Sequence, residues 1–191
     1  MLISLTALLA TPAFAQTSTW NIDTAHSAAQ FTVRHMGISN ANGNFTKTSG
    51  TVQLDEKDIT KSPVEATIDV ASIDTRVADR DNDFKSDHFF DVAKFPTITF
   101  KSKKIAKNGD KLSVIGDLTM HGVTREVTLE SDGLTAAVAD PWGNTRRGFS
   151  AATKVNRQDF GVKWGETLAG GELVVDDEVK ISLDIELEKK K

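Results

Sequence analysis

The segment VKISLDIELE, residues 179–188, decides the fold class. Apolar residues occupy every second position and polar residues stand between them; the apolar ones are Val179, Ile181, Leu183, Ile185 and Leu187. Successive side chains of a β-strand point to opposite faces of a sheet. The segment therefore predicts a long strand with one buried face and one solvated face.

The same alternation recurs along most of the chain that precedes this segment. The longer apolar faces are Ala29/Phe31/Val33/His35, Val64/Ala66/Ile68/Val70, Leu112/Val114/Gly116/Leu118/Met120 and Phe149/Ala151/Thr153/Val155. The shorter ones are Ile98/Phe100 and Val127/Leu129. Together these faces predict about eight strands, each of which needs a partner for its apolar side.

Turn and helix signals favour an antiparallel arrangement. Asn42-Gly43, Asn108-Gly109 and Asp132-Gly133 are dipeptides that favour tight hairpins. Residues 77–86 predict one or two turns of polar helix, and residues 156–169 show no clean period. Because no helix long enough for a crossover lies between the strands, we expect an antiparallel sheet. Strands of about ten residues favour a barrel over a sandwich, so we expect an all-β, eight-stranded antiparallel barrel with a short helix.

The interior of such a barrel is either filled by side chains or holds one small ligand. Four small residues on inward faces would leave room for a cavity, or they interdigitate with the ten Phe and three Trp of the chain: Ala29, Ala66, Gly116 and Ala151. A cluster of phenylalanines either plugs one end beneath the short helix or lines an apolar tunnel: Phe84, Phe89, Phe90, Phe95 and Phe100. The pattern leaves both choices open.

The composition excludes several classes of function. The chain has 191 residues and a formal net charge of −4, so it carries no basic field to hold a nucleic acid, and we expect no nucleic-acid partner. It has no cysteine, which excludes disulfides, thiolate metal sites and cysteine nucleophiles. Its hydrophobic content of 39% is typical of a globular domain.

The first fifteen residues, MLISLTALLATPAFA, differ from the rest of the chain. An apolar run is broken by Pro12, and Ala13-Phe14-Ala15 fits the small-x-small rule for cleavage. We therefore predict a cleaved signal peptide at residues 1–15, a single domain at residues 16–191, and a periplasmic location. The apolar run is shorter than the roughly 20 residues that span a bilayer, so we expect no membrane span.

Neither a metal site nor a catalytic motif stands out. The four histidines show no close ligand spacing, so we expect no metal: His26, His35, His88 and His121. The chain has no nucleotide-binding loop and no nucleophile motif, so we expect neither catalysis nor a cofactor. His35 shares an apolar face with Phe31 and Val33, where an imidazole is either a satisfied core or rim residue or a hydrogen-bonding partner for a ligand.

Several motifs occur in an order that resembles one known family. They are WNIDTAHS at 20–27, FTVRHMG at 31–37, HFFDVAKFP at 88–96, GDLTMHGVT at 116–124 and NRQDFGV at 156–162. Together they resemble the YceI-like family of secreted polyisoprenoid-binding, lipocalin-like proteins. The resemblance runs from about Trp20 to Leu187.

This resemblance implies an extended lipocalin-like barrel whose helix packs near one end. It also implies an elongated apolar cavity that holds an isoprenoid chain, such as a prenyl quinone. The matching positions give these candidate ligand-binding residues: Phe31, His35, Met36, Phe45, Phe84, Phe90, Met120 and Trp164. We add the hypothesis that His35 or Arg157 anchors the head group of the lipid.

Three functions remain open at this point. The first is a barrel that stores, shields or transports an isoprenoid or other long-chain lipid. The second is an interaction module, related to stress, whose cavity is incidental. The third is an enzyme that acts on such a lipid. The sequence identifies neither the lipid nor its donor and acceptor, and it leaves open whether the protein forms a homodimer.

Overall fold

Strands make up most of the computed structural model, which describes residues 17–191. The signal peptide predicted at residues 1–15 lies outside the described residues. The strands are β1 (Thr17–Ile22), β2 (Ala28–His35), β3 (Ser39–Phe45), β4 (Thr48–Asp55), β5 (Val64–Asp69), β6 (Ile73–Asp74), β7 (Thr97–Asn108), β8 (Lys111–Met120), β9 (Val123–Leu134), β10 (Val138–Ala139), β11 (Thr145–Asn156) and β12 (Val175–Lys189). The helices are α1 (Ala78–Lys85) and the short 3-10 turns η1 (Ile59–Lys61), η2 (Val70–Ser72) and η3 (Arg157–Phe160).

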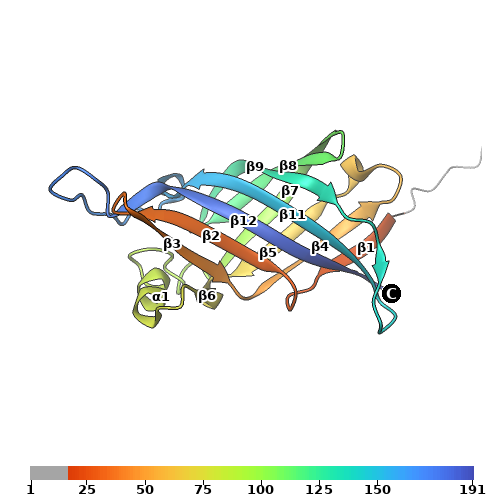
Figure 1. The fold of residues 1–191 in the computed structure, drawn as a ribbon, viewed down its shortest axis with the longest axis horizontal. Coiled ribbons are helices and arrows are strands. Elements are labelled where there is room, and N and C mark those ends of the chain that lie inside the picture. The colour runs from red at the N-terminus through yellow and green to blue at the C-terminus, as the bar shows by residue number, and fades with distance from the viewer. Residues whose placement is uncertain (1–16) are drawn as a thin grey trace, which may run out of the picture.

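Eight strands close an antiparallel barrel. Neighbouring strands pair in the order β11, β9, β8, β7, β5, β4, β1 and β12, and β12 then pairs with β11. The closing pair extends from Arg146 opposite Glu188 to Asn156 opposite Glu178. Figure 1 shows an elongated barrel with α1 beside one end. The predicted eight-stranded antiparallel barrel with a short helix near one end is confirmed.

The strand β12 contains the alternating segment that predicted the fold. It pairs with β11 along one side, and along its other side with β2 and then with β1. Thus β1 and β2 lie end to end beside one long strand. Beyond β2 the sheet continues to β3, which pairs with β2, and to β6, which pairs with β3, so it extends past the closed barrel near α1. At the other end, Leu187 packs with Trp20 and Leu54 in a buried cluster.

One of the three predicted hairpin turns is confirmed and two are wrong. Asn108-Gly109 lies at the turn between β7 and β8. Asn42-Gly43 lies inside β3, and the β2–β3 turn instead contains Met36 (φ 49°) and Gly37 (φ 69°). Asp132-Gly133 lies inside β9, where the pairing with β11 shifts register and Gly133 has a φ of 107°. Both glycines therefore lie in strands and not in turns: Gly43 at a point where another residue approaches the backbone closely, and Gly133 in a β-bulge.

The predicted polar helix is confirmed as α1. Its residue Phe84 packs against the core cluster formed by residues such as Phe45, Val70 and Ile73. Among residues 17–191, no helix is both long enough and apolar enough to cross a bilayer.

Candidate ligand-binding cavity

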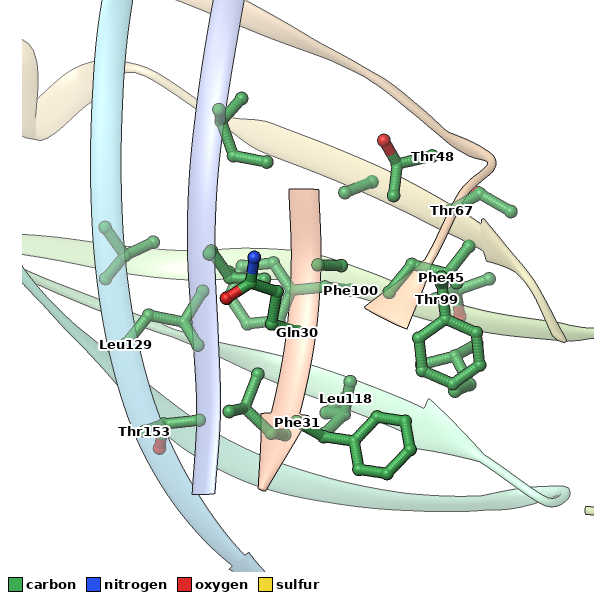
Figure 2. Close-up of a pocket in the computed structure, with 18 of the residues that line it drawn as sticks. Gln30, Phe31, Phe45, Thr48, Thr67, Thr99, Phe100, Leu118, Leu129 and Thr153 are labelled. Atoms are coloured by element: carbon green, nitrogen blue, oxygen red, sulfur yellow. The ribbon is translucent and has the colours of Figure 1, made fainter. Parts of the chain in front are cut away.

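The barrel encloses a cavity of about 230 Å³. Its wall consists mainly of inward-facing aliphatic and aromatic side chains from every strand of the closed barrel. Figure 2 shows part of this wall, with the ring of Phe100 close to its centre. Of the four small residues predicted to leave space, Ala29 and Ala66 line the cavity. The interior is therefore incompletely filled and could hold an apolar group.

The nine candidate ligand-binding residues fall into two groups. Six line the cavity: Phe31, Phe45, Phe84, Phe90, Met120 and Arg157. Three lie outside its wall: His35, Met36 and Trp164. Ligand contact by any of the nine stays a prediction, but the geometry already separates residues that can face a ligand from residues that support the end of the barrel.

His35 is the last residue of β2 and does not line the cavity. The strand β2 stays in register with β3 from Val33, opposite Ala41, to His35, opposite Ser39, so the alternation that groups His35 with Phe31 and Val33 is not interrupted. The register shift between β2 and β12 places its extra residues on β12, between Val175 and Val179. His35 therefore lies beyond the cavity wall, at the end of its strand.

Met36 and Trp164 belong to the segments that close this end of the molecule. The backbone N–H of Met36 donates to the carbonyl oxygen of Val174 at 3.0 Å, which ties the β2–β3 hairpin to the loop before β12. The ring of Trp164, on the same loop, lies 5.1 Å from the ring of Phe89. Both residues therefore support the cavity from outside.

A chain of aromatic contacts closes the barrel near α1. The centroid distances are 6.3 Å for Phe31–Phe84, 5.9 Å for Phe31–Phe45, 6.1 Å for Phe45–Phe90 and 4.7 Å for Phe84–Phe89. These distances lie in the range of favourable aromatic pairs. Because the same rings line the cavity, plugging the end and lining a tunnel are both correct descriptions of them.

Phe95 is the exception in the phenylalanine cluster. Its ring lies 4.6 Å from the ring of His121, and it covers Gly122, where an added Cβ would lie 2.6 Å from a ring atom. It does not line the cavity. Phe95 therefore packs a turn and provides a natural control for the other rings.

Arg157 is the one charged side chain in the cavity wall within the described part of the chain, and it is 4% exposed. Its Nε donates to Asp176 O at 3.0 Å, its Nη1 to Val162 O at 2.9 Å and to Trp164 O, and its Nη2 to Val175 O at 3.2 Å and to Asp177 Oδ1 at 3.0 Å. A guanidinium has five N–H donors, so all of them are used.

These bonds decide what Arg157 can do. They join the end of β11 to residues 162–177 and leave no donor for a lipid head group. Burial lowers the pKa of Arg157, while the charge of Asp177 opposes that effect. The hypothesis that Arg157 anchors a head group therefore conflicts with the hydrogen bonds of its guanidinium group. We instead assign Arg157 the role of positioning residues 162–177.

Sequence reasoning missed Thr48, at the start of β4. This residue lines the cavity and is 6% exposed, yet its Oγ1 has no hydrogen-bond partner among residues 17–191. Ser62 is also in the wall, but its Oγ accepts a bond from the backbone N–H of Asp55 at 3.0 Å. Thr48 stands outside every alternating face read from the sequence, so no pattern could have identified it.

A polar cluster lies at the opposite end of β12. Ligand atoms of Asp23, His26 and Glu186 lie within 4.8 Å of one another, as in a metal site. However, Nη1 of Arg146 bonds both carboxylates, at 2.7 Å for Glu186, and its Nε bonds Asp140 at 2.8 Å. Arg146 thus already supplies the positive charge that a metal ion would bring. The hydrogen bond from His26 lowers the pKa of Asp23 to about 2, with Arg146 adding to the effect.

Comparisons with known proteins agree with this geometry. Residues 20–187 match the model of the YceI-like domain. A UPF0312 protein of Vibrio parahaemolyticus is 41% identical over 157 residues, which cover 81% of this chain and 82% of that protein. The crystal structure of BcnA from Burkholderia cenocepacia is similar with a TM-score of 0.75 at 28% identity, over 86% of this chain and 98% of BcnA.

A more distant structure adds a functional description of its own. A domain from Saccharophagus degradans, described as polyisoprenoid binding and implicated in plant cell wall breakdown, has a TM-score of 0.66. The match covers 90% of this chain and 98% of that domain. At 17% identity it shows a common fold alone.

Proposed function

Because this chain belongs to the YceI-like domain family, we propose that its cavity binds the apolar chain of an isoprenoid-type lipid, either a prenyl quinone or a polyprenyl chain. The observation that carries the proposal is the cavity wall, which is apolar along the length of the barrel. The description of the Saccharophagus degradans domain as polyisoprenoid binding supports the same ligand class.

The energetics of such a ligand suit storage or transport. Burial of apolar carbon contributes about 0.8 kcal/mol per CH₂, so a five-carbon isoprene unit contributes on the order of 3–4 kcal/mol relative to water. A bilayer offers nearly the same gain. The lipid would therefore partition between protein and membrane near balance, which lets a carrier both load and release it.

The size of the cavity sets how much of the lipid it encloses. An engineered apolar cavity of roughly 150 Å³ binds benzene. At the same volume per carbon atom, the cavity of about 230 Å³ holds on the order of nine carbons, about two isoprene units. A longer chain requires the phenylalanines of the aromatic end to move, or it extends out of the barrel.

We further propose that the protein binds its lipid without transforming it and does so in the periplasm. The binding role is supported by the wall, whose one charged side chain in residues 17–191, Arg157, uses all its donors within the fold. The location rests on the predicted signal peptide at residues 1–15, and fractionation of cells that produce the full chain tests it.

Lipid extraction tests the ligand. The full chain is purified from the cells that produce it, extracted with organic solvent, and the extract is analysed by mass spectrometry. A prenyl lipid in near-stoichiometric amount supports the proposal. An empty extract from folded protein, with no uptake of added isoprenoids, rejects it and favours the interaction module.

A matched pair of variants links the lipid to the cavity. Leu183 lines the cavity on β12, whereas its neighbour Ser182 is exposed on the outer face. Leu183→Trp fills the cavity and should abolish lipid recovery, while Ser182→Trp should retain it. Equal recovery from both folded variants would place the lipid elsewhere on the protein.

A further inference from the structure

We propose that the cavity selects isoprenoid lipids whose polar group is uncharged, and that the hydroxyl group of Thr48 is the hydrogen-bonding partner of that polar group. This inference rests on the proposed function and narrows its ligand class. A carbonyl or hydroxyl head group fits, whereas a phosphate or diphosphate does not.

Within residues 17–191, the cavity wall offers no free positive charge. Burial of an ionised group is costly unless an opposite charge or several hydrogen bonds compensate it. Arg157 is the one charged residue that faces the cavity in the part of the chain that the structure describes, and its five donors are occupied. Its Nη2 is also paired with the carboxylate of Asp177 at 3.0 Å. A phosphate inside the barrel would have no cation to meet.

The segment from α1 to Phe95, at the aromatic end, has more acidic than basic residues. It contains five aspartates, three lysine or arginine residues and His88. Lys94 is paired with Asp91 at 2.7 Å, and Arg80 donates to the carbonyl oxygen of Thr75 at 2.9 Å. Because negative charge predominates in this segment, the segment repels an anionic head group.

The buried hydroxyl group of Thr48 has no hydrogen-bond partner among residues 17–191. Buried polar groups almost always have a hydrogen-bond partner, so an exception requires an explanation. Thr48, at the start of β4, pairs with Ile68 of β5 in the cavity wall and is labelled in Figure 2. Rotation about its Cα–Cβ bond to another staggered rotamer moves Oγ1 to a new position, from which it can turn to a ligand atom in the cavity. A neutral carbonyl or hydroxyl group is the partner that an uncharged hydroxyl can satisfy.

The experiment compares three ten-carbon probes on lipid-free full chain by calorimetric titration: geraniol, geranyl phosphate and the hydrocarbon 2,6-dimethyl-2,6-octadiene. We expect geraniol to bind on the order of tenfold or more tightly than geranyl phosphate. Geranyl phosphate binding as tightly as geraniol overturns the inference and leaves the proposed function standing. Binding of none of the three probes rejects the proposed function itself.

Two matched variants test Thr48. Thr48→Val should weaken geraniol binding roughly 2- to 10-fold, the effect of one net hydrogen bond, and should leave hydrocarbon binding unchanged. Thr51→Val removes a hydroxyl from the same strand, β4, at a position outside the cavity wall, and should leave geraniol binding unchanged. Thr48→Ser, which keeps the hydroxyl group, should retain the preference for geraniol. Equal losses in Thr48→Val and Thr51→Val overturn the assignment to Thr48.

Discussion

Phe31 on β2 pairs with Gly43 on β3, and its ring lies over the glycine: a Cβ atom added to Gly43 would be 2.5 Å from Cζ of Phe31. The centroid of the Phe31 ring is 5.9 Å from that of Phe45 and 6.3 Å from that of Phe84. The missing side chain of Gly43 therefore sets where the aromatic end of the cavity begins.

Gly43→Ala should destabilise the protein by about 1–3 kcal/mol, because the added methyl group collides with the ring of Phe31 and forces it from its position. Chemical denaturation measures the loss. The double variant Gly43→Ala with Phe31→Leu should lose less than the sum of the two single variants, since a smaller side chain accepts the methyl group. Strictly additive losses would show that the two residues are not coupled.

Gly148→Ala is the control for this pair. Its added Cβ would lie 3.2 Å from the nearest atom, a methyl carbon of Thr135. We expect a smaller change in the free energy of unfolding than in Gly43→Ala.

The barrel could be predicted from the sequence because its signal is local. A strand with one buried face repeats every two residues, so β12 can be recognised from its own side chains. Gly43 is different. An Asn-Gly pair favours a hairpin turn, but here the glycine is required by Phe31 on another strand, a relationship absent from the neighbouring sequence.

The residues of the candidate site also divide into those that a local sequence pattern predicts and those that depend on distant parts of the chain. Phe31 and Met120 line the cavity as their alternating strands predict, whereas His35 has the same period but lies at the end of β2, outside the wall, because alternation does not show where a cavity ends. The role of Arg157 depends on carbonyl groups up to nineteen residues further along the chain and on the carboxylate of Asp177. Thr48 is distinguished only because its Oγ1 has no hydrogen-bond partner among residues 17–191, which the sequence alone does not show.

Arg157→Met should destabilise the protein by about 3–5 kcal/mol, because it leaves buried carbonyl oxygens and the carboxylate of Asp177 without their donor. Hydrogen exchange should show the greatest loss of protection in residues 162–177. Arg157→Lys keeps the charge but has three donors in place of five, so it should recover part of the stability. Wild-type protection of this loop in Arg157→Met contradicts the positioning role.

Stability should fall as the pH is lowered from about 4 to 2. The folded-state pKa of Asp23 is lowered from 3.8 to about 2, chiefly by the hydrogen bond from His26. Ionised Asp23 therefore stabilises the folded state above pH 3.8, and this contribution is lost as the pH falls towards 2. Thermal unfolding of Asp23→Asn should show a smaller dependence on pH in this range. Asp132→Asn, at a side chain that is 92% exposed, should behave as the wild type.

His26 gives the opposite dependence. The hydrogen bond to Asp23 raises the pKa of His26 above 6.5. Protonated His26 therefore stabilises the folded state below pH 6.5, and its contribution disappears as the pH rises through the raised pKa. The thermal midpoint of His26→Gln should change less than that of the wild type as the pH rises above 6.5. An identical profile in both proteins would show that the His26–Asp23 pair does not contribute to stability.

Phe84→Ala should shift ligand preference towards longer prenyl chains. Phe84 lines the cavity and contacts Phe89 at 4.7 Å, so its removal adds space for about one isoprene unit at the aromatic end. Burial of the extra carbons should raise affinity on the order of tenfold or more for farnesol relative to geraniol. Phe95→Ala removes an equal ring from outside the cavity wall and should leave that ratio unchanged. The same ratio of affinities in both variants would mean that the aromatic end does not limit chain length, and that a longer lipid leaves the barrel by another route.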